Sequence, residues 1–97
     1  MEVYIINRTE YYEGTVVTSV FGIADNEKDM KNLFKECEKN TTKLMKESLK
    51  ESDESTKLSK RWDTYYRDYV IENENQNYRY SITISHIDND KNEKIVL

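Results

Sequence analysis

Residues 25–50, DNEKDMKNLFKECEKNTTKLMKESLK, contain the clearest structural signal in the chain. Asp25 or Asn26 can accept the first backbone N–H groups of a helix, and Glu27 and Asp29 follow in the first turn, where the helix dipole favours acidic side chains. Apolar side chains then recur at steps of three and four, which places them on one helix face. They are Met30, Leu33, Phe34, Cys37, Leu44 and Met45, with Thr41 on the same side. We therefore predict one long helix over residues 27–50.

Two β-branched runs precede this helix. Residues 3–11 read VYIINRTEY and residues 15–23 read TVVTSVFGI, both typical of strands. Between them, Glu13-Gly14 is a turn signal, because glycine adopts positive φ at little steric cost. This pattern predicts an antiparallel hairpin over residues 3–23.

The second half of the chain is less uniform. Residues 51–57 are polar and aperiodic and predict a loop, and residues 88–97 predict a polar tail in which 95–97 could add an edge strand. Residues 58–70 have apolar spacing that suits a helix but also aromatic and β-branched composition that suits a strand. Residues 78–87 alternate, with Tyr78, Tyr80, Ile82, Ile84 and His86 on one face. We prefer a second hairpin, 65–72 with 78–87, while helix or strand stays open for 58–70.

Together these elements predict an α+β domain of two layers. A four-stranded antiparallel sheet in the order β-β-α-β-β would carry the helix across one face. With 97 residues the chain has room for one domain, 1–97.

The residue inventory excludes several classes of chemistry. Cys37 is the only cysteine and lies in the apolar stripe, and His86 is the only histidine and lies in an alternating strand. A disulfide framework, a cysteine zinc site and a nucleophile–base pair are therefore not expected. We also expect neither a signal peptide nor a transmembrane helix, because the apolar runs are short and no basic segment precedes an apolar one. We predict a cytoplasmic protein of a bacterial host that is not an enzyme, binds no metal or cofactor and does not contact membrane.

Charge is distributed unevenly along the chain, whose net charge is −4. Residues 28–62 carry ten basic against seven acidic side chains, whereas the flanking segments 1–27 and 63–97 are acidic. Seven lysines fall within a narrow sector of the helix, opposite the apolar stripe. These residues, the lysine ridge, are Lys28, Lys31, Lys35, Lys39, Lys43, Lys46 and Lys50. The ridge is either a contact for nucleic-acid phosphates or the solvated outer face of an amphipathic helix.

Acidic and aromatic side chains are interleaved in the last third of the chain. Acid plus tyrosine can imitate a nucleic-acid backbone or dock in a basic protein groove, and tyrosine is a preferred interface anchor. The alternative is a sheet face wetted by solvent, with tyrosines paired across strands. Trp62 would either cap the core at the sheet edge or form an exposed hot spot. The predicted acidic surface comprises Asp63, Asp68, Glu72, Glu74, Asp88 and Asp90, with Trp62, Tyr65, Tyr69 and Tyr80 as aromatic anchors.

The N-terminal half contains several short sequence segments in a recognisable order. Val3-Tyr4-Ile5-Ile6, the turn Tyr12–Thr15 and Val20-Phe21-Gly22-Ile23-Ala24 before a capped helix resemble small uncharacterised proteins of bacteriophages and low-GC Gram-positive bacteria. The resemblance covers about half of the chain and departs from the pattern at residues 21–24. It implies a mobile-element setting and transfers no active site.

In that setting, small acidic single-domain proteins without catalytic residues often block host machinery, as anti-CRISPR and anti-restriction proteins do; this link is an analogy of class. We therefore expect an inhibitor that binds a basic, nucleic-acid-handling host-defence protein through the acidic surface. Alternatives are a nucleic-acid-binding accessory protein that uses the lysine ridge, an immunity-type protein, or a self-associating structural protein, for example a homodimer that pairs through an edge strand.

Overall fold

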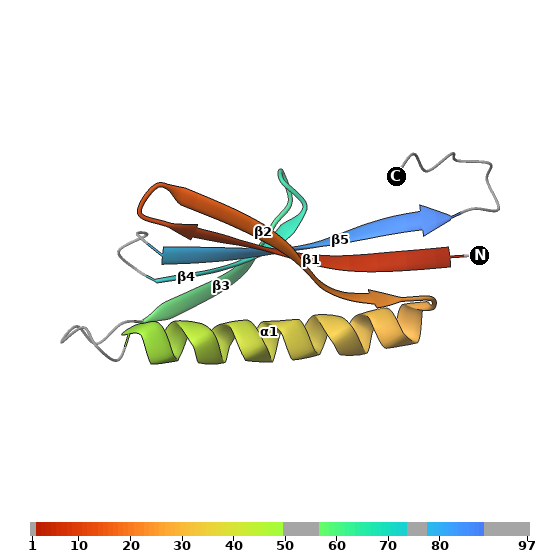
Figure 1. Cartoon of the computed structure of the whole chain (residues 1–97), viewed down its shortest axis with the longest axis horizontal. Helices are drawn as coiled ribbons and strands as arrows, with labels where there is room; N and C mark the ends of the chain where they lie inside the picture. Colours follow the sequence, from red (N-terminus) through yellow and green to blue (C-terminus); the bar gives the residue numbers. More distant parts are fainter. Residues whose placement is uncertain (1, 50–56, 74–77, 89–97) are drawn as a thin grey trace.

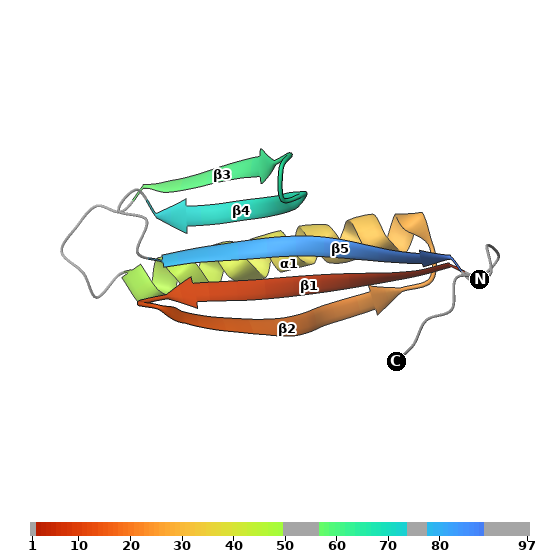
Figure 2. The same cartoon turned by 90° about the horizontal axis from the view of Figure 1, so that it is seen from above.

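Five antiparallel strands and one helix make up the computed structural model, which describes residues 2–49, 57–73 and 78–88. The elements are β1 (Glu2–Tyr12), β2 (Thr15–Ala24), α1 (Glu27–Leu49), β3 (Leu58–Asp63), β4 (Asp68–Asn73) and β5 (Tyr78–Asp88). The sheet order is β2-β1-β5-β4-β3, so β2 and β3 form its two edges (Figure 2). The helix lies across one face (Figure 1). The predicted α+β class with one helix on an antiparallel sheet is confirmed. The predicted loop at 51–57 and tail at 88–97 lie mostly outside the described residues.

The prediction of four strands was wrong, because β3 adds a fifth and the order is β-β-α-β-β-β. β3 pairs with β4 along its whole length, from Leu58 opposite Asn73 to Asp63 opposite Asp68. The turn between them contains neither glycine nor proline. It is held instead by Asp63, whose Oδ1 accepts the backbone N–H groups of Tyr65 and Tyr66 at 3.0 and 3.1 Å, and Arg67 takes a positive φ of 52°. An Asx turn of this kind gives only a weak sequence signal.

The β1–β2 turn has the geometry that the sequence predicted. Glu13 and Gly14 have φ values of 46° and 82°, both positive, as a type I′ turn requires. Strand pairing starts at Tyr12 opposite Thr15 and continues to a bulge at Phe21, which lies between the partners of Ile6 and Asn7. The turn therefore determines which residues of β2 direct their backbone N–H and C=O groups toward β1 and which direct them outward.

Helix α1 begins at an asparagine cap. Asn26 Oδ1 accepts the backbone N–H of Asp29 at 2.8 Å, and the carbonyl of Asn26 accepts the N–H of Met30 at 3.0 Å. Cys37, Thr41 and Met45 on the apolar stripe are fully buried against the sheet.

The core lies between α1 and one face of the sheet. Ile6, Ile71 and Ile82 are fully buried there, one on each of the strands β1, β4 and β5. Tyr78 and Tyr80 lie on the same face as Ile82, as the alternation of β5 predicted. The helix approaches β2 at Gly22, where a Cβ atom would stand 3.1 Å from Leu33 Cδ2.

Candidate interaction surface

The described members of the predicted acidic surface are engaged within the chain. Asp63 holds the β3–β4 turn. Asp68 is buried with its Oδ2 accepting a hydrogen bond from Ser81 Oγ, while its Oδ1 has no hydrogen-bond partner among the described residues. Glu72 is buried and paired with Arg61. Glu74, Asp90 and the side chain of Asp88 lie outside the described part. The carboxylates that the structure describes therefore do not form one exposed acidic patch.

The predicted aromatic anchors separate into two groups. Tyr80 is buried in the core, and Tyr69 is half-buried with its ring edge-on to Phe34 of α1, at 5.5 Å between centroids. Both contribute to the contact between sheet and helix rather than to an outer surface. Trp62 and Tyr65, by contrast, are 51% and 82% exposed.

Tyr66 joins these two exposed side chains at the end of the β3–β4 hairpin. It is 72% exposed, and its ring meets that of Tyr65 edge-on at 4.8 Å. Figure 1 shows the turn standing out from the sheet on the side away from α1. We call Trp62, Tyr65 and Tyr66 the aromatic tip.

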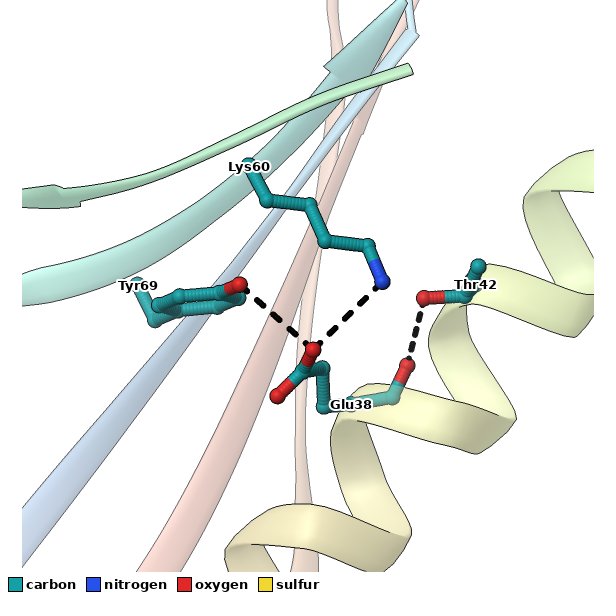
Figure 3. A network of polar contacts seen from close by, with 4 residues as sticks. All are labelled: Glu38, Thr42, Lys60 and Tyr69. Atoms are coloured by element: carbon teal, nitrogen blue, oxygen red, sulfur yellow. Dashed lines mark hydrogen bonds and ion pairs between the residues drawn. The ribbon is translucent and has the colours of Figure 1, made fainter.

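A polar network fixes the hairpin that carries the aromatic tip to the helix (Figure 3). Glu38 Oε1 lies 3.4 Å from Lys60 Nζ and accepts a hydrogen bond from the Tyr69 hydroxyl at 3.5 Å. Thr42 Oγ1 donates to the Glu38 carbonyl one turn away, at 2.7 Å. Burial, together with the Glu38 carboxylate, raises the pKa of Tyr69, so its hydroxyl stays a donor at neutral pH. The β3–β4 hairpin, which carries the aromatic tip, is therefore fixed to α1 by polar contacts.

The lysine ridge is exposed along the described part of α1, from Lys28 to Lys46; Lys50 lies outside the described residues. Lys31 pairs with Glu27 one turn earlier, at 3.1 Å, and both side chains are well exposed. A pair of this kind is typical of a solvated helix face. The structure is compatible with both interpretations of the ridge.

The single cysteine and the single histidine of the chain both contact neighbouring side chains. Cys37 is fully buried beside Thr41, and burial raises the pKa of its thiol, which disfavours the thiolate. His86 stacks on Tyr4 at 4.4 Å, with its Nε2 3.5 Å from Glu2 Oε1. Among the described residues, no group of three His, Cys, Asp or Glu side chains is placed to hold a metal ion, and no helix is long and apolar enough to cross a membrane.

A second polar network joins β5 to β1 on the face of the sheet that carries α1, near the β1–β2 turn. Tyr80 and Tyr78 both donate to Glu10 Oε2, at 2.6 and 2.7 Å. The hydrogen bond from Tyr80, followed by that from Tyr78, lowers the pKa of Glu10. Burial, followed by the same hydrogen bond to Glu10, raises the pKa of Tyr80 well above its usual value. Glu10 therefore serves as an ionised acceptor for two core tyrosines.

This network predicts that the contribution of Glu10 to stability depends on pH. Because the folded-state pKa of Glu10 is lower than the usual 4.5, its stabilisation is complete above the unfolded-state pKa and is lost as pH falls through the folded-state pKa. Glu10→Gln should therefore be less stable than the natural chain at neutral pH, and the gap should shrink below about pH 4.5. Urea unfolding of both chains from neutral to acidic pH measures this gap. A gap that does not change with pH would contradict the assignment.

Sequence reasoning missed one surface, the outer edge of β2. No described strand pairs with this edge. Its side chains Val16, Val17, Val20 and Ile23 are all more than half exposed. The available signal was the run TVVTSVFGIA, residues 15–24, which contains no charged residue in a chain that is 35% charged. The run predicted a strand but not the position of that strand at an edge.

No protein-family model, no curated protein and no solved structure matches this chain. Its function is therefore inferred from the surfaces themselves.

Proposed function

We propose that the chain is a non-catalytic binding protein that docks on a partner protein through the aromatic tip. The observation that carries this proposal is the exposure of three large aromatic side chains within five residues, Trp62, Tyr65 and Tyr66. Large apolar surface left in water is a feature of interaction sites, and tyrosine and tryptophan are the side chains most often found as hot spots.

Side-chain hydrogen bonds hold the turn and the hairpin that carry the aromatic tip, which favours a preformed docking site. Asp63 holds the backbone N–H groups of Tyr65 and Tyr66, and the Glu38 network holds the hairpin to α1. A turn that is ordered before binding loses less conformational entropy when the partner arrives. The backbone that carries the two tyrosines is thus held by side chains of the protein itself.

The proposal retains the interaction protein expected from the sequence and changes its surface. Since Asp63, Asp68 and Glu72 are engaged within the chain, recognition rests on aromatic packing instead of on acidic side chains. In the mobile-element setting that the resemblance implies, the partner is a host-defence protein and the chain acts as its inhibitor. Aromatic anchoring predicts that binding changes little with salt, whereas an acidic surface would lose affinity steeply.

Affinity capture with a matched variant tests this function. Tagged natural chain, Tyr65→Ser/Tyr66→Ser and the control Tyr12→Ser are incubated with nuclease-treated lysate of a low-GC Gram-positive host. We expect one stoichiometric protein with the natural chain and with Tyr12→Ser, whose tyrosine is exposed at the other hairpin. Titration of the purified partner should then show a roughly 100-fold or greater loss of affinity for the double variant, as for two hot-spot residues.

Two outcomes would overturn the proposal. Equal affinity of the natural chain and Tyr65→Ser/Tyr66→Ser would remove the aromatic tip from the interface. Capture of nucleic acid from a parallel lysate without nuclease, with no protein retained from the nuclease-treated lysate, would transfer the function to the lysine ridge.

A further inference from the structure

The two edges of the sheet are built differently. The edge strand β3 is six residues long and carries Lys60, Arg61 and Asp63, which are the charges that natural proteins place on an edge to prevent further pairing. The other edge strand, β2, is ten residues long, contains no charge and no proline, and exposes branched apolar side chains. The β3 edge is thus protected by charge, whereas the β2 edge carries no such protection and pairs with no described strand on its outer side.

The turn defines which backbone groups of β2 are available. In a type I′ hairpin the residues that flank the turn, Tyr12 and Thr15, form a hydrogen-bonded pair, and hydrogen-bonded and non-hydrogen-bonded pairs alternate from there. Up to the bulge, Val17 and Ser19 therefore direct their N–H and C=O groups toward β1. Val16, Thr18 and Val20 direct theirs outward, along an edge that no described strand occupies.

The β2 strand of a second copy, running antiparallel, hydrogen-bonds to these outward N–H and C=O groups in one register. With a two-fold axis at Thr18, Val16 lies opposite the second copy's Val20, and Thr18 lies opposite its counterpart, so all three outward residues form hydrogen-bonded pairs. Val16 and Val20 are 60% and 59% exposed and share the face of the sheet away from α1. Two cross-strand valine pairs therefore form on that face, a favourable combination for β-branched residues.

We propose that the chain forms a homodimer through β2, which joins two five-stranded sheets into one. A second copy suits this strand as the occupant because the residues that the two-fold register brings together are Val16 with Val20 and Thr18 with Thr18, and none of them carries a charge. The contact is isologous and closed, so it ends at two subunits. This surface lies apart from the aromatic tip, which the dimer leaves free.

Sedimentation velocity of the full chain over a range of concentrations tests the dimer with a charge-swap pair. Val16→Lys/Val20→Lys places lysine opposite lysine twice across the two-fold axis, and should raise the dimer dissociation constant by roughly 30-fold or more. Val16→Lys/Val20→Glu places lysine opposite glutamate twice and should restore most of the dimer. Both variants replace exposed side chains, and thermal unfolding checks that each is folded. Tyr65→Ser/Tyr66→Ser should dimerise like the natural chain.

Hydrogen exchange adds a residue-level readout. The amides of Val16, Thr18 and Val20 should be protected in the natural chain and exchange freely in the Val16→Lys/Val20→Lys variant. A natural chain that stays monomeric at the highest concentration, or a dimer that survives the double lysine variant, would overturn the proposal. A monomeric Val16→Lys/Val20→Glu variant would overturn the register centred on Thr18.

Discussion

Replacing Ile82 with alanine is expected to lower the free energy of unfolding by about 3 to 4 kcal/mol. Ile82 is fully buried in β5, between Arg8 of β1 and Tyr69 of β4, and belongs to the core beneath the helix. Truncation removes apolar contacts and leaves a cavity, because strands on both sides prevent the site from collapsing. Since domains of this size have roughly 5 to 15 kcal/mol of stability in total, a large share would be lost.

Urea unfolding followed by circular dichroism measures this loss. Ile23→Ala is the matched control, since it removes the same atoms from a side chain that is mostly exposed on β2. The control should change the free energy of unfolding by less than about 1 kcal/mol. Similar losses for both variants would show that the core does not lie between β5 and α1.

The second large effect concerns the ion pair between Arg61 and Glu72, which joins β3 to β4 on the face away from the helix. The Glu72 side chain is only 10% exposed, whereas Arg61 is 47% exposed. Arg61→Met leaves a buried carboxylate without its charged partner and should lower the free energy of unfolding by about 2 kcal/mol. This expected loss of free energy is smaller than that for a fully buried pair, because solvent screens the exposed arginine.

A double-mutant cycle separates the pair from its surroundings. Arg61→Met/Glu72→Met removes both charges and should be within about 1 kcal/mol of the natural chain, because neither member of the pair is left without its partner. Lys31→Met/Glu27→Met, at a well-exposed pair on α1, is the control and should show coupling below about 0.5 kcal/mol. Additive effects of the single Arg61 and Glu72 changes would contradict a functional ion pair.

Much of the fold could be predicted from local pattern. The apolar spacing from Met30 to Met45 predicted α1 and the face it buries, and Glu13-Gly14 predicted the β1–β2 turn. β3 was not predicted, because residues 58–63 lie at an edge where only one face is partly covered. Such a strand has weak alternation, and Leu58 and Trp62 are also spaced as on a helix.

The interaction surfaces could be predicted only in part. Trp62 and Tyr65 were identified as candidate anchors and are exposed, and the lysine ridge is exposed along α1. Tyr80 was also a candidate, but its hydroxyl is held by Glu10, seventy residues away in the sequence. Clustering of acids and tyrosines in the sequence does not reveal such a distant partner.

The sequence alone determined the α+β class, the helix with its apolar stripe and its lysine ridge, and the first hairpin. These features depend on side-chain periodicity and turn residues within a few positions of one another. The tertiary structure decided which carboxylates are engaged within the chain and where TVVTSVFGIA lies. An uncharged β-branched run suits a central strand as well as an edge, because burial depends on neighbours supplied by distant segments. Only the order β2-β1-β5-β4-β3 places this run at an edge of the described sheet, and that order follows from the pairing of β1 with β5, which lie far apart in the sequence.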